Sequence, residues 1–267
     1  MAHTADILVV DDERVILDAV SKICSLEGYR VAQAPEASVA AHMLESGTYG
    51  LMLCDIMMPQ MDGFQLLEIA RKRAPGMPVI MATGYSTVEN AVRSLREGAI
   101  DFVPKPFTSD ELLSAVGRAV RYRTIAEALH AVGQGPADPA LLIVPCPPKY
   151  QRLGYASWVV LEDGGTALIG LTHLFLRILE RIDALDLQPV NAEIAQGTTC
   201  AQVRTPDGLS HSVLAPVSGR IVEVNPAATP DAIEKDPYFA GWLYRCIPSD
   251  VDYEMPQLTP FSAGTLF

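Results

Sequence analysis

Leu51-Met-Leu-Cys-Asp55 is a short apolar run that ends in an aspartate, and the first half of the chain contains three more short apolar runs. The others are Ile7-Leu-Val-Val10, Pro78-Val-Ile-Met-Ala82 and Asp101-Phe-Val-Pro104. Short apolar runs that alternate with helical patterns are typical of buried strands in a parallel sheet. Strand and helix patterns alternate between Ile7 and about residue 130, which predicts an α/β fold with a doubly wound, five-stranded parallel sheet.

A polar side chain ends or follows each of these runs. These side chains are Asp11 and Asp12, Asp55, Thr83, and Lys105. We expect them to converge, because ligand sites in open α/β sheets lie at the carboxyl ends of the strands. Clustered carboxylates suit Mg²⁺, and an aspartate beside a metal ion and an ammonium group can accept a phosphoryl group. Lys105 would neutralise charge on that group and Thr83 would donate a hydrogen bond to it.

Length and composition predict a globular protein with two domains. The chain has 267 residues, of which 49% are hydrophobic and 19% charged. No apolar run is long enough to span a bilayer, and the first residues lack the basic and apolar regions of a signal peptide. The five cysteines are scattered without metal-ligand spacing, as expected of free thiols in a reducing compartment. We therefore expect a cytoplasmic protein without membrane insertion.

The excess of acidic over basic side chains argues against DNA binding by the second half of the chain. The net charge is −12; residues 1–125 carry 12 basic and 16 acidic side chains, and residues 126–267 carry 8 basic and 16 acidic ones. A nucleic-acid-binding domain normally shows a basic stripe. The second half, at −8, has the opposite balance.

Residues 5–123 resemble the receiver domain of two-component response regulators, whose fold is flavodoxin-like. The resemblance is carried by Asp11-Asp12, Leu53-Cys-Asp-Ile-Met-Met-Pro-Gln-Met-Asp-Gly63, Met81-Ala-Thr-Gly-Tyr85 and Asp101-Phe-Val-Pro-Lys-Pro-Phe107. It implies that Asp55 accepts a phosphoryl group from a histidine kinase or a phosphotransfer protein. The same resemblance implies a Mg²⁺ site formed by Asp11, Asp12, Asp55 and the backbone carbonyl of Met57.

The resemblance also assigns the switching residues. It implies that Lys105 and Thr83 contact the phosphoryl group and that Phe102 is an aromatic switch that moves inward as Thr83 moves. The peptide bond between Lys105 and Pro106 is expected to be cis, as in the family. No enzymatic activity is expected beyond assistance to the receiver's own phosphorylation and dephosphorylation.

The last helix of the first half is predicted to run from Thr108 to about His130, where Gly and Pro residues end it. The predicted boundaries are a receiver domain at 1–125, a helix extension and Pro/Gly-rich linker at 126–149, a second domain at 150–250 and a C-terminal tail at 251–267.

The second half is rich in β signals. A hairpin is predicted from strands at 157–161 and 166–169, and a short helix near 172–182. Further strands are expected at 199–204, 212–215 and 219–224. Together they predict a mainly β domain, a small barrel or sandwich.

This half resembles the H protein of the glycine cleavage system, a carrier with a lipoyl-type β fold. The matching stretches are Ile169-Gly-Leu-Thr172, Ala215-Pro-Val-Ser-Gly-Arg-Ile-Val-Glu-Val-Asn225 and Asp236-Pro-Tyr-Phe-Ala-Gly-Trp-Leu243. The family carries lipoate on a lysine in the preceding hairpin, here Val203–Ser212, which contains no lysine. Arginine cannot replace that amine, because its guanidinium stays protonated. We therefore expect no lipoate, and we expect His211 in this hairpin to be an exposed or packed side chain rather than a replacement active residue.

Two functions remain open at this point. The first is a phosphorelay response regulator whose lipoyl-like second domain binds an unknown protein rather than DNA, with a homodimer through the receiver as an option. The alternative is a regulatory or carrier component of a metabolic, glycine-cleavage-like complex.

Overall fold

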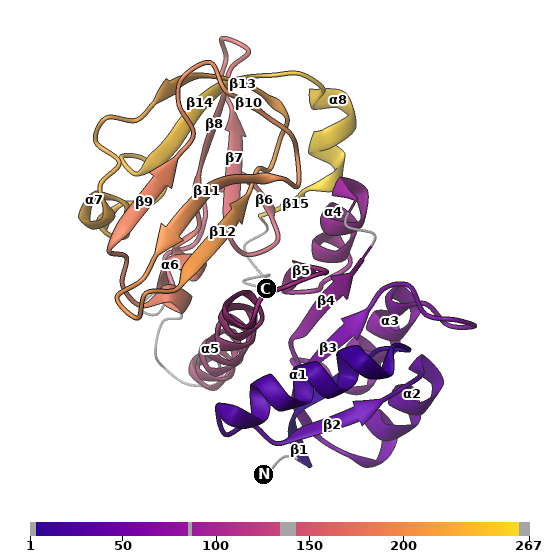
Figure 1. Ribbon diagram of the computed structural model, residues 1–267. Coiled ribbons are helices and arrows are strands. Elements are labelled where there is room, and N and C mark those ends of the chain that lie inside the picture. Colours follow the sequence, from indigo (N-terminus) through magenta and orange to yellow (C-terminus); the bar gives the residue numbers. More distant parts are fainter. Residues whose placement is uncertain (1–3, 85–86, 134–142, 262–267) are drawn as a thin grey trace. The chain divides into compact units, whose positions relative to one another are not determined.

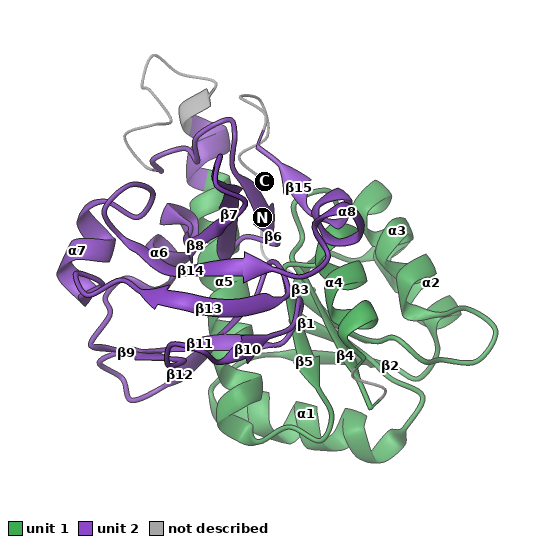
Figure 2. Cartoon of the chain, turned by 90° about the horizontal axis from the view of Figure 1, so that it is seen from above, with its two compact units in different colours: residues 1–127 green, residues 128–267 purple. Residues whose placement is uncertain are grey.

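The computed structural model describes residues 4–84, 87–133 and 143–261. The chain divides into two compact units, residues 1–127 and 128–267, which Figure 2 colours separately. Each unit has its own core and is described by itself.

The first unit alternates strands and helices along the chain (Figure 1). Its strands are β1 (Ala5–Val10), β2 (Val31–Ala34), β3 (Tyr49–Asp55), β4 (Val79–Thr83) and β5 (Asp101–Pro104). Its helices are α1 (Arg14–Leu26), α2 (Ala37–Ser46), α3 (Gly63–Arg73), α4 (Val88–Arg96) and α5 (Ser109–Gly133).

The five strands form one parallel sheet, as the sequence predicted, and their order is β2-β1-β3-β4-β5. All seven residues of β3 and all five of β4 are buried, because helices cover the sheet and its strands are continuous apolar runs. The predicted doubly wound architecture is therefore confirmed.

Caps define where two of the helices begin. Asp62 and Gln65 form a reciprocal capping box at the start of α3. Thr108 and Glu111 do the same before α5, where each side chain bonds to the backbone N–H of the other residue. Helix α5 then runs for 25 residues to Gly133, close to the predicted end near His130.

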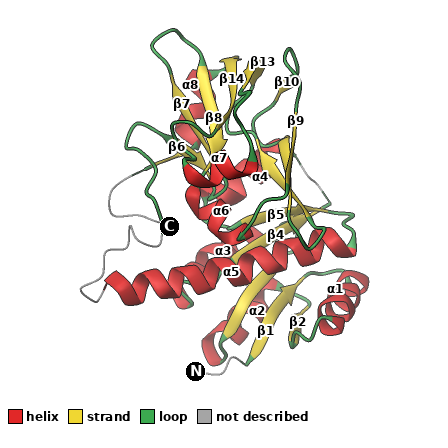
Figure 3. Ribbon diagram, turned by 90° about the vertical axis from the view of Figure 1, so that its left-hand side faces the viewer, coloured by secondary structure: helices red, strands yellow, loops and turns green. Residues whose placement is uncertain are grey.

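The second unit is mainly β (Figure 3). Its strands are β6 (Gln151–Leu153), β7 (Ser157–Leu161), β8 (Ala167–Leu171), β9 (Ala184–Leu187), β10 (Glu193–Ile194), β11 (Thr199–Arg204), β12 (Ser210–Leu214), β13 (Gly219–Val224), β14 (Trp242–Pro248) and β15 (Thr259–Pro260). The short helices are α6 (His173–Leu179), α7 (Pro230–Lys235) and α8 (Val251–Glu254), followed by the 3₁₀ turn η2 (Met255–Gln257).

These strands form two antiparallel sheets. The larger has the order β10-β13-β14-β8-β7-β6-β15, and the smaller has the order β12-β11-β9. The predicted hairpin is present as β7 and β8, with Val159 opposite Ile169. Gly170 of β8 lies under the Trp158 ring, since a β-carbon there would approach that ring to 2.4 Å. The prediction of a mainly β second domain is confirmed.

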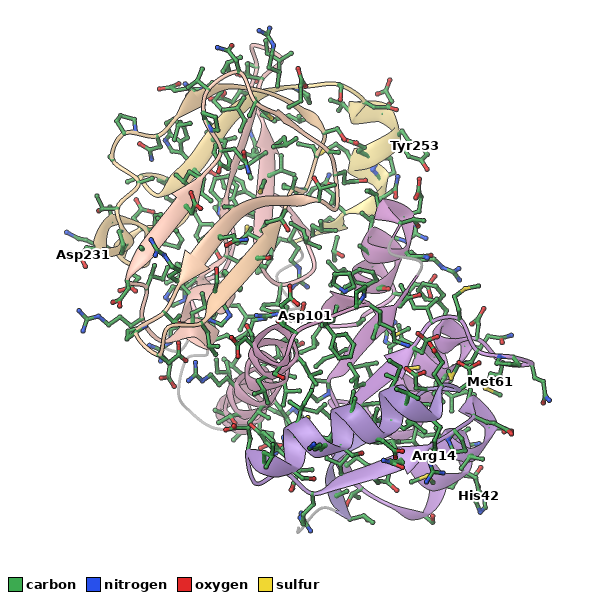
Figure 4. All side chains as sticks on the ribbon, in the orientation of Figure 1. Arg14, His42, Met61, Asp101, Asp231 and Tyr253 are labelled. Atoms are coloured by element: carbon green, nitrogen blue, oxygen red, sulfur yellow. The ribbon has the colours of Figure 1, made fainter. Side chains whose placement is uncertain are left out.

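Part of the C-terminal segment, predicted as a tail at 251–267, is built into the fold. Residues 251–261 enter the fold: β15 pairs with β6, and Glu254 is 6% exposed. The Glu254 carboxylate accepts hydrogen bonds from the backbone N–H of Ser218, at 2.7 Å, and from its hydroxyl. Tyr253, beside it, points outward (Figure 4) and is 64% exposed. The last predicted tail residues, 262–267, lie outside the described residues.

The segment 126–149, predicted as a helix extension followed by a Pro/Gly-rich linker, begins as expected. Its residues 126–133 belong to α5. Its end packs against the second unit, because Ile143 and Cys146 are both buried. Residues 134–142 lie outside the described residues.

One glycine fixes the junction between β3 and α3, and a substitution there should test the fold. A β-carbon at Gly63 would lie 2.2 Å from the Asp55 carbonyl oxygen, which is backbone and cannot yield. We expect Gly63→Ala to lower the free energy of unfolding by about 1–3 kcal/mol. Chemical denaturation of the full chain measures this value.

Gly117 of α5 provides the matched control, because a β-carbon there meets no atom within 4 Å. Gly117→Ala should raise the free energy of unfolding by about 0.5–1 kcal/mol, the ordinary gain for alanine within a helix. Equal effects of the two substitutions would contradict the proposed close packing at Gly63.

Candidate functional site

The strand register brings the predicted site residues to one edge of the first sheet. Neighbouring strands are aligned so that their ends are level: Val10 is opposite Cys54, Asp55 opposite Ala82, and Thr83 opposite Pro104. Asp11, Asp55, Thr83 and Lys105 therefore lie at the carboxyl ends of adjacent strands, as expected for an open α/β sheet.

The ammonium group of Lys105 joins two of the predicted acids. Its Nζ donates to Asp11 Oδ2 at 2.6 Å and to Asp55 Oδ1 at 2.7 Å. Glu13 Oε1 lies 4.0 Å from the same nitrogen. The side chains of Lys105, Asp11 and Asp55 are 9%, 3% and 6% exposed. The centre of the site is therefore a buried, charge-assisted arrangement of one cation and two anions.

Burial and pairing shift the ionisation of these groups. Burial raises the pKa of Asp11 above its usual value, and the nearby Lys105 opposes this shift without cancelling it. Burial lowers the pKa of Lys105, but its hydrogen bonds to Asp11 and Asp55 outweigh burial, so the net shift is upward. The lysine is accordingly held as a cation beside carboxylates that have lost much of their hydration.

Backbone amides hold the second oxygen of each buried acid. The Met57 N–H donates to Asp55 Oδ2 at 2.6 Å, and the Glu13 N–H donates to Asp11 Oδ1 at 3.0 Å. These bonds fix both carboxylates in orientation. The Met57 side chain is 54% exposed.

Asp12, unlike its neighbour Asp11, is exposed. Among residues 4–84, 87–133 and 143–261, no group of three or more His, Cys, Asp or Glu side chains is close enough to hold a metal ion. The arrangement nevertheless fits a hard divalent cation in its chemistry. Two oriented carboxylates and an adjacent exposed one offer the oxygen ligands that Mg²⁺ prefers, and burial leaves Asp11 short of compensation for its charge.

The two predicted switch residues lie on neighbouring strands of the sheet and differ in burial. Thr83 is fully buried at the end of β4, and its carbonyl accepts a 2.8 Å hydrogen bond from the Lys105 N–H. Phe102 is half-buried and packs against the core on one side of the sheet. The Lys105–Pro106 peptide bond is cis, as expected.

An ion pair beside Phe102 has no counterpart in the sequence-based prediction. Asp101 Oδ1 accepts from the Phe102 N–H at 2.8 Å, and Asp101 Oδ2 accepts from two nitrogens of Arg118, at 2.8 and 2.7 Å. Arg118 also donates to the Ser114 hydroxyl at 2.6 Å. Figure 4 labels Asp101 on β5, next to α5. The pair connects the strand that carries Phe102 and Lys105 to helix α5.

In the second unit, β11 and β12 form the hairpin in which the carrier family has its lysine. Thr205 Oγ1 donates to Asp207 Oδ1 at 2.5 Å and lies 3.0 Å from His211 Nε2. His211 is 3% exposed and Thr205 is 4% exposed. His211 is therefore a packed side chain at the end of the hairpin, which is one of the two placements expected for it.

A separate surface pocket of about 490 Å³ lies between α3 and α4. Its floor contains Phe64, on which the Arg93 guanidinium stacks at 3.8 Å. Arg93 is also bound to Glu97, at 2.7 Å, and Arg71 to the Glu97 carbonyl, at 2.8 Å. Its arginines are thus bound within the unit, and the Lys105 cluster does not line it.

Comparison with known families assigns both units. The response regulator receiver domain matches residues 7–117, and the glycine cleavage H-protein matches residues 149–260. No helix in the part of the chain that the structure describes could cross a membrane.

Individual relatives match mostly over the first unit. The response regulator protein FleR of Pseudomonas aeruginosa is 36% identical over 134 residues, which are 50% of this chain and 26% of FleR. DctD of Rhizobium meliloti, a C4-dicarboxylate transport transcriptional regulatory protein, is 25% identical over 267 residues, 100% of this chain and 53% of DctD. The chain thus spans about half or less of these relatives.

Among solved structures, a CheY-like receiver domain protein from Methanospirillum hungatei is 39% identical, covering 45% of this chain and 95% of that one with a TM-score of 0.43. The two family matches show that the chain contains a response regulator receiver domain, over residues 7–117, and a glycine cleavage H-protein domain, over residues 149–260.

Proposed function

We propose that this chain is a phosphorylation-controlled response regulator whose receiver accepts a phosphoryl group at Asp55 from a histidine kinase or a phosphotransfer protein. The observation that supports this most is the buried Lys105 ammonium, which bonds to both Asp11 and Asp55 at the strand ends. Such an arrangement is suited to an anionic group that arrives at this edge of the sheet.

In the proposed transfer, an oxygen of Asp55 attacks the phosphorus of a phosphohistidine. A P–O bond forms, the P–N bond breaks, and the imidazole leaves with the bonding electron pair and takes up a proton. The Met57 amide and Lys105 orient the Asp55 carboxylate for this attack, at 2.6 and 2.7 Å. Asp11, Asp12, Asp55 and the Met57 carbonyl would hold Mg²⁺, which would supply charge neutralisation for the phosphoryl oxygens.

The product changes the charge balance around Lys105. Asp55 loses its carboxylate charge to the acyl phosphate, while the phosphoryl group adds about two negative charges. Lys105 then exchanges its bond to Asp55 for one to the phosphoryl group. Because Lys105 follows β5 directly, its displacement bears on the strand that carries Phe102.

The Asp101–Arg118 pair offers a route from that strand to α5. Asp101 holds the Phe102 amide through one oxygen and Arg118 through the other. A shift of Phe102 therefore alters the geometry of a half-buried ion pair, and such a pair is sensitive to geometry because its partners are partly desolvated. We propose that this ion pair transmits the conformational change of β5 to α5.

The proposed output is the H-protein-like domain acting as a protein-interaction module without DNA contact. Support comes from the net charge of −8 over residues 126–267, which opposes a nucleic acid backbone. DctD is named as a transcriptional regulator, but this chain covers only 53% of it. The five cysteines are free and buried, which favours the cytoplasm as the setting.

Asp55→Asn tests the phosphoryl acceptor directly. With Mg²⁺ and acetyl phosphate, intact mass spectrometry of the wild-type chain should show one phosphoryl group, which the variant should lack because an amide cannot form the acyl phosphate. Lys105→Ala should slow phosphorylation about 10²-fold, since it removes the fixed cation.

Asp18→Asn is the control for this experiment, because Asp18 is an exposed acid of α1 that pairs with Arg14. It should be phosphorylated like the wild type. Phosphorylation of Asp55→Asn at the wild-type rate would place the acceptor elsewhere.

A second candidate function is a carrier or regulatory part of a glycine-cleavage-like complex, favoured by the H-protein match over residues 149–260. The β11–β12 hairpin argues against the carrier form. The chain has no lysine between Lys149 and Lys235, and the hairpin turn carries the Thr205–Asp207–His211 hydrogen bonds instead.

Incubation with lipoate, ATP and a lipoate ligase separates these functions. The intact mass of the full chain should remain unchanged, because no amine is available at the turn. An authentic H protein in the same tube should gain the lipoyl group. A lipoyl adduct mapped to residues 199–214 of this chain would restore the carrier function and leave the receiver proposal unaffected.

A further inference from the structure

A short irregular segment, residues 143–150, precedes the first strand of the second unit and is called the strap below. Most of it precedes the H-protein match, which begins at residue 149. Ile143 and Cys146 of the strap are buried at 4% exposure each, whereas Val144 between them is 47% exposed. The strap therefore turns two of its side chains, three residues apart, into the domain without belonging to a strand.

The buried side of the strap meets an aromatic cluster. Cys146, Trp158 and Tyr238 form its centre, with Tyr150 packed against them. The ring centroids of Tyr150 and Trp158 are 4.7 Å apart, and those of Trp158 and Tyr238 are 6.2 Å apart. Trp158 is fully buried in the presence of the strap.

Two hydrogen bonds fasten Val144 of the strap, and a third bond between their partners closes them into a ring. The Val144 N–H donates to His173 Nδ1 at 2.9 Å, and the Val144 carbonyl accepts from the Tyr238 hydroxyl at 3.2 Å. The Tyr238 oxygen accepts from the His173 N–H at 3.1 Å, which completes the ring. Both backbone groups of Val144 are thus held by two side chains from distant parts of the domain.

The strap has a lower capacity for hydrogen bonding than a strand. Pro145, Pro147 and Pro148 have no N–H to donate. By contrast, β7 beneath it pairs with strands on both sides, β6 and β8. Segments with few backbone hydrogen bonds open locally at lower free energy than sheet strands do. The hydrogen-bond ring around Val144 is therefore the contact of the strap that a change in a single group breaks most easily.

That group is His173, since its Nδ1 accepts from the Val144 N–H only when it carries no proton. The charged group that acts on it is Arg177 on α6, and the Tyr238 hydroxyl contacts its backbone N–H. Burial, and then the positive charge of Arg177, lower the pKa of His173, so the imidazole is neutral at pH 7. Protonation at Nδ1 would place its N–H opposite the Val144 N–H. Two donors cannot bond to each other, so the ring would break.

We propose that residues 143–150 are a releasable strap over the aromatic cluster, locked by the His173–Val144–Tyr238 ring and released when His173 Nδ1 is protonated. The direction of the pH dependence follows from the lowered pKa of His173. The lock is complete above the ordinary histidine value of about 6.5 and weakens as the pH falls below it. This device lies wholly within the second unit and does not depend on phosphorylation of Asp55.

Cys146 supplies the readout. Its side chain is buried under the strap, so a thiol reagent reaches it only when the strap opens. Burial also raises the pKa of its thiol to about 12, which keeps the closed form protonated. The full chain would be pulsed with a maleimide between pH 8 and pH 5, and the modified cysteines identified by peptide mass spectrometry. Cys200, fully buried in the same unit, is the internal reference, and the Cys146/Cys200 ratio cancels the general effect of pH on thiol reactivity.

The ratio should rise about 3- to 10-fold in the wild type as the pH falls from 7.5 to 5.5, the range expected for losing one hydrogen bond. His173→Asn should keep a low ratio at every pH, because its amide oxygen accepts without titrating. Tyr238→Phe should raise the ratio even at pH 8. His42→Asn, at an exposed histidine of α2, should behave as the wild type.

A wild-type ratio that does not change with pH would overturn the proposal, and so would a pH response retained in His173→Asn. Thermal unfolding of each variant shows whether it is folded. If Tyr238→Phe fails to fold, the wild type and His173→Asn still decide the outcome between them.

Discussion

The ammonium of Lys105, bonded to Asp11 and Asp55 at the carboxyl edge of the sheet, is the interaction on which the first unit's chemistry depends. Two carboxylates that are almost completely buried would repel each other and would be poorly solvated without it. The β-strand register brings these groups together, and the Gly63 junction keeps α3 close to Asp55. A phosphoryl group at Asp55 would change the partner of the Lys105 cation.

Lys105 is also connected through the backbone to the strand that carries the predicted switch residue. Lys105 follows β5, and β5 carries both Phe102 and Asp101. Through Arg118, Asp101 connects this strand to α5, a helix of 25 residues. A change of charge at the strand ends is thereby linked through physical contacts to helix α5.

The sequence predicted those features whose partners are set by regular structure. The strand-end residues could be identified because the carboxyl ends of parallel strands lie at the same edge of a sheet. No contact had to be known in order to place Asp11, Asp55, Thr83 and Lys105 there. Pairs formed by tertiary packing left no such signal. Arg118 is one of several arginines on α5, and only the packing of α5 selects it for Asp101. In the same way, Glu254 falls in the predicted C-terminal tail, because its partner, Ser218, is 36 residues away and leaves no local signal. The proline-rich run around Cys146 read as a linker, yet Val144 is fixed by His173 and Tyr238 from distant parts of the chain.

Amide hydrogen exchange resolved at Phe102 and along residues 109–127 of α5 tests the central claim most directly, with and without Mg²⁺ and beryllofluoride. The wild type should change its exchange rates at both places on adding beryllofluoride. In Arg118→Gln the change should be retained at Phe102 and lost in α5, whereas Arg96→Gln on α4 should behave as the wild type. An unchanged α5 in the wild type, or the full wild-type response in Arg118→Gln, would contradict the account.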